Sequence, residues 1–187
     1  MKSMYSFVAI SGSFRKGSYN TIALKGAQKL SLSNIVIDHL SIAEFPFYNF
    51  DLHEKKFPDE VEKLKEAIKQ ADEIIIFAPE YNFSISGVLK KASNFISRTP
   101  KKLFDNKRVG IISASPGLLG GVRTHDYLRQ IMTAVNAFAI NQSESIISKA
   151  DTKFDESGNL RDKKTKEIMS KFIVSLAAFS DNFKKVK

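Results

Sequence analysis

A polar loop close to the start of the chain contains the residue types that bind a phosphate group. It covers residues 10–20, with the sequence ISGSFRKGSYN, and joins an apolar run to a stretch whose apolar residues have helical spacing. A helix start offers unpaired N–H groups and the positive end of the helix dipole. The guanidinium of Arg15 adds a planar fork of donors that matches phosphate oxygens. Short polar side chains supply further donors: Ser13, Ser18, Asn20 and Thr21.

The spacing of this loop separates it from two common nucleotide-binding motifs. Gly12 and Gly17 stand where a Walker loop has its glycines, but Ser18 and Tyr19 replace the lysine and the hydroxyl residue of that motif. The dinucleotide fingerprint is absent because no glycine follows Gly12 at a distance of two residues. We therefore expect a site for one terminal phosphate, as in a mononucleotide. The alternative is an ordinary strand-to-helix loop that Ser18 or Asn20 caps.

Two later loops suit the flat heterocycle of such a ligand. Residues 79–82, Pro-Glu-Tyr-Asn, combine a stiff turn, an aromatic ring and consecutive backbone N–H groups. Residues 113–121 contain three glycines, at which the backbone can approach a planar ligand closely. The alternative for each loop is a tight turn without a ligand. The candidate contacts are Pro79, Glu80, Tyr81, Asn82, Ser115, Gly117, Gly120 and Gly121.

Strands and helices alternate along the chain around these loops. Apolar runs predict five strands, at residues 5–10, 34–40, 74–78, 108–113 and within 138–147. Helical spacing follows at residues 21–30, from 58 onward, at 88–97, 124–137 and around 168–179. The pattern predicts an α/β fold with a doubly wound, five-stranded parallel sheet between two layers of helices. The three loops follow the first, third and fourth strands, so all open on the carboxyl edge, where such sheets bind ligands.

Length and composition bound the remaining possibilities. A chain of 187 residues with 43% hydrophobic residues predicts a single domain over residues 1–187. The absence of cysteine excludes disulfides and thiolate ligands, and the three histidines match no ligand spacing, so we expect no metal site. No apolar run is long enough to span a bilayer and no leader precedes the first strand, which favours a cytoplasmic protein without a membrane partner.

The net charge of +9 would also suit a nucleic-acid partner. The lysines are spread over several segments and mostly interleaved with acids, so we expect solvated helix faces, no nucleic acid, and a field that favours small anions. The segment 41–57 is irregular and rich in aromatic residues. We expect these aromatics to cover the edge of the core; the alternative is a subunit or substrate surface.

The three loops together resemble those of a known family. Residues 12–20, GSFRKGSYN, resemble the G-S-x-R-x-x-S-x-N loop of the NADPH-dependent FMN reductase family. Residues 79–90, PEYNFSISGVLK, are similar to its second signature, and Ser115 with Gly120, Gly121 and Arg123 is similar to its third. The similarity extends from Val8 to Asn136 and is greatest to the branch that contains chromate and quinone reductases. Azoreductases share the same scaffold.

The resemblance implies a flavodoxin-like fold with bound FMN, in a homodimer or homotetramer whose flavin lies near the subunit boundary. It implies two-electron transfer from NAD(P)H to small-molecule acceptors: quinones, azo compounds, chromate or free flavin. The residues of the first motif would then bind the phosphate, those of the second would line the isoalloxazine, and those of the third would complete the pocket. These residues are Ser13, Arg15, Ser18, Tyr19, Asn20 and Thr21; Pro79, Glu80, Tyr81 and Asn82; and Ser115, Gly117, Gly120 and Gly121.

Several positions depart from the family pattern. Ser86 stands where the family usually has proline, and Lys91, Asn94 and Phe95 replace its usual Asn, Asp and Trp. We expect these four positions to shape the dimer surface and the substrate cleft.

Hydride transfer by a ping-pong sequence would be the chemistry of the flavin itself, with no side chain in a strictly catalytic role. Backbone N–H groups from Glu80 to Asn82 could stabilise negative charge on the reduced ring. Arg123 or His125 could contact the phosphates of the nicotinamide nucleotide, but we expect solvation at the surface for each. Two other functions stay open: a flavodoxin-like electron carrier without pyridine-nucleotide chemistry, and a phosphate-binding regulatory module without flavin.

Overall fold

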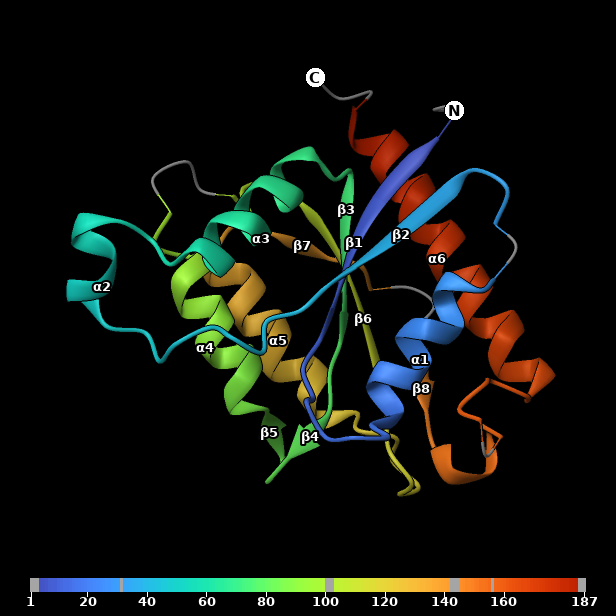
Figure 1. The fold of residues 1–187 in the computed structure, drawn as a ribbon. Coiled ribbons are helices and arrows are strands. Elements are labelled where there is room, and N and C mark those ends of the chain that lie inside the picture. Colours follow the sequence, from blue (N-terminus) through green and yellow to red (C-terminus); the bar gives the residue numbers. More distant parts are fainter. Residues whose placement is uncertain (1–3, 31, 100–102, 142–144, 156, 185–187) are drawn as a thin grey trace.

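A parallel β-sheet forms the middle layer of the fold (Figure 1). The computed structural model describes residues 4–30, 32–99, 103–141, 145–155 and 157–184. Within them the sheet has six strands: β1 (Tyr5–Ser11), β2 (Ile35–Leu40), β3 (Glu73–Phe77), β6 (Arg108–Ala114), β7 (Phe138–Ala139) and β8 (Ser145–Ile147). The strand order is β2-β1-β3-β6-β7, with β8 also paired to β6, and every pairing is parallel. This is the order of flavodoxin-like doubly wound sheets, which reverse between β1 and β3. The predicted fold class is confirmed.

The predicted fifth strand is divided into two short strands. β7 pairs with Arg108 and Val109, whereas β8 pairs with residues 112–114 of the same neighbour. Between them, the guanidinium of Arg129 binds the Ile140 carbonyl at 3.0 Å and the Asn141 side chain at 2.7 Å. A side chain of α5 (Arg123–Ala134) therefore binds a backbone carbonyl that an unbroken fifth strand would present to the ladder. The sequence pattern did not indicate this interruption.

Helices cover both faces of the sheet, as Figure 1 shows. α1 (Tyr19–Gln28) and α6 (Lys163–Lys184) lie on one face; α3 (Asp59–Gln70), α4 (Gly87–Ile96) and α5 (Arg123–Ala134) lie on the other. Successive side chains of a strand point to opposite faces. In β3, Ile74 and Ile76 join the core cluster under α3, α4 and α5, whereas Ile75 and Phe77 join the cluster under α1 and α6. All five residues of β3 are buried, as expected for a central parallel strand.

Four smaller elements complete the described chain, and one of them is a 3₁₀ helix, η1 (Ala150–Thr152). A short helix, α2 (Phe50–Lys55), interrupts the segment that we expected to be irregular, and Asn49 caps it by accepting from the Asp51 N–H. Two short strands, β4 (Glu80–Tyr81) and β5 (Ser84–Ile85), form an antiparallel hairpin where the sequence predicted a loop.

No helix in the described residues has the length and apolar composition that crossing a bilayer requires.

The last helix begins at a charged cap. Asp162 precedes α6 and accepts hydrogen bonds from the backbone N–H and the hydroxyl of Thr165. These bonds, together with Lys153 at 3.2 Å, lower the pKa of Asp162 from 3.8 to about 2. The predicted inner stripe of this helix is buried at Met169, Phe172, Ile173, Leu176 and Ala177. Ile168 begins the apolar pattern from which we predicted this helix, but it is 40% exposed because it lies on the solvent side of the helix.

The cap predicts an acid-dependent loss of stability. The folded pKa of Asp162 is depressed, so its contribution is complete above pH 3.8 and disappears as the pH falls through about 2. Asp162→Ala should lower the free energy of unfolding at pH 7 by about 1 kcal/mol. Asp162→Asn keeps the acceptor oxygen without the titration, so it should lose less stability than the native protein between pH 4 and pH 2.5. Urea denaturation followed by circular dichroism measures both effects. Equal acid losses in the native and Asn proteins would contradict this account.

Candidate functional site

A cavity of about 440 Å³ lies at the carboxyl edge of the sheet. This volume lies within the range of small-molecule pockets. The loops that follow β1, β3 and β6 form its walls, so the structure brings together the three loops that the sequence singled out. The lining residues are Ser13, Arg15, Ser18, Tyr19, Asn20, Pro79, Glu80, Tyr81, Ala114, Ser115 and Pro116. The other predicted contacts, Thr21, Asn82, Gly117, Gly120 and Gly121, are not among them.

The first wall consists of hydrogen-bond donors at the start of α1. Ser18 is the N-cap, and its hydroxyl oxygen accepts from the Thr21 N–H. The first backbone bond of the helix is from Ile22 to Ser18, so the N–H groups of Tyr19 and Asn20 precede the intrahelical ladder. The Arg15 guanidinium donates to the Gly17 carbonyl at 3.0 Å and lies 5.6 Å from the centre of the Tyr19 ring. This wall presents cationic and neutral donors, as an anion requires.

Asn20 and Thr21 use their side chains inside the protein. The Asn20 amide donates to the Ala114 carbonyl at 2.9 Å and accepts from the Ala114 N–H at 3.0 Å. The Thr21 hydroxyl lies 2.8 Å from the Ser11 hydroxyl and 3.2 Å from the Ser13 carbonyl. Both side chains therefore hold the loop in place from beneath. Spacing alone could not distinguish this supporting role from a direct contact with a ligand.

The second wall is the β4–β5 hairpin. Its turn residues Asn82 and Phe83 have φ values of 50° and 63°, as a type I′ turn requires. This left-handed conformation is common for asparagine but strained for a bulky phenylalanine. The guanidinium of Arg123 lies 4.4 Å from the centre of the Phe83 ring. The Tyr81 hydroxyl lies 3.2 Å from that of Ser13, so it joins this wall to the first.

The Glu80 carboxylate ties the hairpin to α5. It accepts from the backbone N–H of Arg123 at 3.0 Å and from its guanidinium at 3.1 Å. Negative charge is stabilising at a helix N-terminus, so Glu80 caps α5 from a distant part of the chain. Both oxygens of the Glu80 carboxylate thus accept hydrogen bonds from Arg123, so we expect a ligand to contact the backbone and the aliphatic part of Glu80.

The third wall corrects the interpretation of two glycines. A Cβ at Gly120 would lie 2.5 Å from the Ile146 side chain and 2.9 Å from the Ser148 nitrogen. At Gly121 a Cβ would lie 3.2 Å from that of Ser113, and both glycines have positive φ. Glycine is required at both positions because the loop packs closely on β8 and β6. The sequence indicated a close approach of the backbone, but it could not show that the approaching group is another part of the protein and not a ligand.

The structure also corrects the expected positions of several side chains. His125 is 1% exposed, with its Nε2 2.9 Å from the Ser113 hydroxyl, so the expected solvation at the surface is wrong for this residue. Ser86 and Phe95 were expected at a subunit surface or cleft, but both are buried. Phe95 packs edge-on against the rings of Phe45 and Tyr48. The prediction that the aromatics of segment 41–57 cover the core is confirmed for the buried Phe45 and Phe57, but it is wrong for Phe47 and Phe50, which are 85% and 58% exposed.

Ser86 is a structural residue of the site whose role the sequence analysis missed. Its hydroxyl donates to the Gly12 carbonyl at 2.7 Å and accepts from the Leu89 N–H at 3.3 Å, as the N-cap of α4. It therefore joins the loop after β1 to the loop after β3. Its position just before the apolar-periodic stretch that starts at Val88 is the sequence signal that would have identified the cap.

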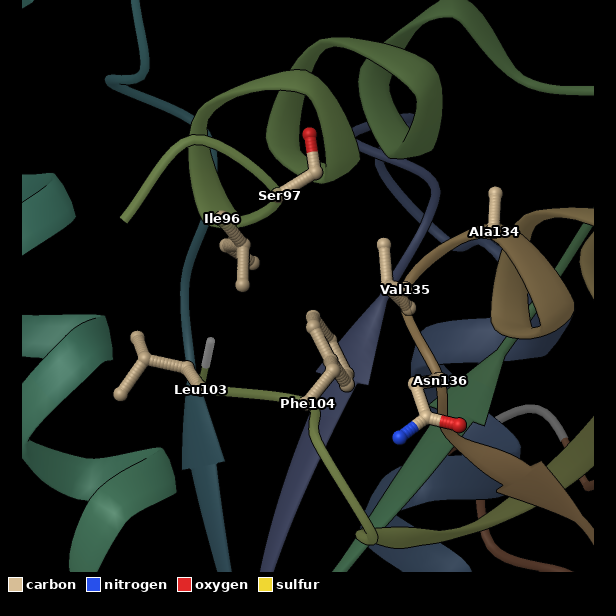
Figure 2. A pocket seen from close by; sticks show the side chains of 7 residues that line it. All are labelled: Ile96, Ser97, Leu103, Phe104, Ala134, Val135 and Asn136. Atoms are coloured by element: carbon tan, nitrogen blue, oxygen red, sulfur yellow. The ribbon is translucent and has the colours of Figure 1, made fainter. Parts of the chain in front are cut away.

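A second hollow, of about 170 Å³, lies at the other end of α4 and α5. α4 and α5 begin at the carboxyl edge with Gly87 and Arg123, whereas this hollow adjoins their last residues, Ile96 and Ala134. Figure 2 shows mainly apolar side chains around it. None of the predicted site residues is among the described residues that line it: Ile96, Ser97, Leu103, Phe104, Ala134, Val135 and Asn136.

Comparisons with known proteins identify the family of the chain. The model of the NADPH-dependent FMN reductase family matches residues 5–152. An NAD(P)H-dependent FMN reductase of Pseudomonas aeruginosa is 38% identical over 169 residues, which cover 90% of this chain and 91% of that protein. A quinone reductase of Escherichia coli is 34% identical over 190 residues, covering 100% of both. Among solved structures, the NAD(P)H:acceptor oxidoreductase FerB of Paracoccus denitrificans matches with a TM-score of 0.87 and 26% identity, over 96% of this chain and 98% of that one.

The fold and the cavity define a flavodoxin-like α/β protein with a small-molecule pocket where the sheet reverses its winding. The chain belongs to the NADPH-dependent FMN reductase family. It is an FMN-dependent NAD(P)H oxidoreductase, and the prediction from the three loop motifs is confirmed at this level.

The buried cap at Ser86 leads to a stability prediction. Ser86→Ala removes the acceptor for the Leu89 N–H and the donor to the Gly12 carbonyl, so the free energy of unfolding should fall by about 1–2 kcal/mol. Ser93→Ala is the control, because Ser93 is inside α4 and donates only to the preceding turn. That control should be neutral or slightly stabilising, since alanine is the better helix former. Chemical denaturation of both variants measures the difference, and equal stabilities would refute the role of Ser86.

Proposed function

We propose that the chain, as a single flavodoxin-like domain, transfers two electrons from NAD(P)H to quinones while FMN is bound in the cavity between the three loops. The observation that carries the proposal is the convergence of the three motif loops on one cavity at the switch point of the sheet. Quinone as the acceptor is supported by the full-length similarity to the Escherichia coli quinone reductase. An NADPH:quinone oxidoreductase of Arabidopsis thaliana is also 37% identical over 186 residues.

The phosphate of FMN is assigned to the first wall. Arg15, Ser13 and Ser18 provide a guanidinium and two hydroxyls, and Tyr19 and Asn20 provide N–H groups at the helix start. All of these groups donate hydrogen bonds, so the donor set fits a phosphate monoester. The nearby Glu80 carboxylate is compensated by Arg123, which limits its repulsion of an anion. Thr21 supports this wall from beneath.

The isoalloxazine ring is assigned to the space between the second and third walls. Bound FMN supplies the hydride chemistry, and the protein orients the ring and excludes water from it. Pro79, Glu80 and Tyr81 line one side, and Ser115 lines the other. We assign to the backbone N–H groups from Glu80 to Asn82 the stabilisation of charge on the ring. Gly117, Gly120 and Gly121 would complete the pocket by shaping its third loop.

We further propose a homodimer or homotetramer with the cavity near the subunit boundary. Large apolar side chains stand exposed on the loops that border the cavity, as expected of a surface that a second copy covers. Phe83 is 65% exposed, Leu118 77% and Leu119 53%. Sedimentation equilibrium of the FMN-loaded protein tests this proposal, and a monomer at micromolar concentration would refute it.

Arg15→Ala tests the assignment of the phosphate. Loss of a charge-assisted hydrogen bond typically costs about 1.5–3 kcal/mol, so the Kd for FMN should rise at least about tenfold. Quenching of FMN fluorescence by the apoprotein measures this Kd. Lys16→Ala is the matched control: Lys16 is the adjacent exposed cation, but it does not line the cavity. Equal effects of the two substitutions would reduce the role of Arg15 to general electrostatics, and an unchanged Kd for Arg15→Ala would refute it.

Steady-state kinetics with a panel of acceptors tests the activity. We expect NAD(P)H to bleach the bound FMN without oxygen, and kcat/KM for quinones to exceed that for azo dyes, chromate or free FMN. A yellow protein that NAD(P)H does not bleach would be an electron carrier. A protein that binds no FMN would be the phosphate-binding regulatory module. A larger kcat/KM for another acceptor would keep the assignment as a reductase but would contradict quinone as the preferred acceptor.

A further inference from the structure

Three side chains from separate segments meet outside the described cavity. Phe14 belongs to the loop after β1, Phe47 to the loop after β2, and Lys91 to α4. The Lys91 Nζ lies 5.9 Å from the centre of the Phe14 ring and 5.8 Å from that of the Phe47 ring. Each distance is within the range of a cation–π interaction. The Lys91 ammonium therefore lies close to two aromatic rings, and we call these three residues the aromatic–lysine site.

The site combines exposed rings with a positive charge that has no acidic partner among the described residues. Phe47 is 85% exposed and Phe14 47%, whereas Lys91 is only partly exposed. Within the described part of the chain, no carboxylate lies within 4.0 Å of the Lys91 ammonium, although other lysines such as Lys65 have such partners. A ligand with an aromatic ring and a negative group would match both features, because it could stack on a phenyl ring and pair with the ammonium.

The aromatic–lysine site adjoins the cavity. Phe14 lies in sequence between Ser13 and Arg15, and both of these neighbours line the cavity. α4 begins at the same edge of the sheet, where its cap Ser86 is bonded to the Gly12 carbonyl. A ligand that places one ring in the cavity and carries a second ring on a long connection can therefore continue onto this site.

NADPH is such a ligand, and it is a substrate of this enzyme family. We propose that Lys91, Phe14 and Phe47 bind the adenosine end of NADPH, with the Lys91 ammonium on the 2′-phosphate and the adenine against the exposed phenyl rings. The inference rests on the proposed function, since the nicotinamide must lie in the cavity. A quinone acceptor fits the aromatic–lysine site less well, because a neutral quinone has no anionic group for Lys91. NADH lacks the 2′-phosphate, so the site favours NADPH.

Steady-state kinetics of the FMN-loaded enzyme with both nucleotides provides the first test. Lys91→Gln should raise KM for NADPH about tenfold or more while KM for NADH changes less than twofold, with kcat largely kept. Lys91→Arg should restore most of the NADPH preference. Lys90→Gln is the control, because it removes the adjacent lysine, which is not part of the site. A rise in KM for the acceptor alone, or an equal rise for both nucleotides, would overturn the proposal.

Direct binding of nucleotides that cannot be oxidised provides the second test. Calorimetry of the FMN-loaded protein should show that 2′,5′-ADP binds at least about tenfold more tightly than 5′-AMP. Lys91→Gln should abolish this difference in affinity, and Phe47→Ala should weaken the binding of both nucleotides by a similar factor. Equal affinity of the native protein for the two ligands would overturn the proposal. If NADH and NADPH are oxidised equally well and Lys91→Gln changes neither, this inference fails while the proposed reductase stands. A failure of the proposed function would instead appear as the absence of nucleotide oxidation.

Discussion

The hydrogen bonds between Asn20 and Ala114 are the interaction on which the site depends most. Ala114 is the last residue of β6, where the N–H and C=O groups of a parallel strand need partners outside the ladder. The Asn20 amide satisfies both groups at once, and the pair is buried. Because Asn20 lies in the first turn of α1, these bonds fix the phosphate loop relative to the loop after β6. The Ser86–Gly12 bond fixes the same loop relative to the loop after β3.

The amino and carboxyl ends of the sheet differ in the interactions that stabilise them. At the amino end, Glu73 is fully buried and accepts from the backbone and the guanidinium of Arg108. Burial raises the pKa of Glu73 although Arg108 opposes this effect, and Ser180 completes the network. Breaking such a pair leaves an uncompensated buried charge, so this end holds the sheet together. The carboxyl end instead contains the strained turn at Asn82 and Phe83. The hydrogen bonds of Glu80 to Arg123, at the start of α5, keep the hairpin that bears this turn in place.

The sequence allowed the fold to be predicted because periodicity reports burial directly. The run at Ile74–Ile76 could only be a strand covered on both faces, and the positions of the loops then followed from the parallel arrangement. What the sequence could not reveal were partners distant along the chain. Asn20 and Ser13 look equivalent as polar residues of one loop, yet only the structure shows that the Asn20 side chain is used by Ala114. The same limit applies to Glu80 and to the neighbours of Gly120. By contrast, the cap at Ser86 has a local signal.

The cavity and the aromatic–lysine site beside it are built from residues of different kinds. The cavity is lined mainly by residues of the three motif loops, which include serines, two tyrosines, Glu80 and the exposed Arg15. Phe14 occupies the unspecified position of the first motif, and Lys91 stands where the family usually has asparagine. Phe47 lies outside all three motifs, in the loop between β2 and α2. Substitutions at such positions leave the buried Asn20 and Ser86 bonds intact, so the surface beside the cavity can change without loss of the fold. Under the proposed function, the flavin and the adenosine end of the nucleotide are therefore contacted by different residues, so one set can be substituted without the other.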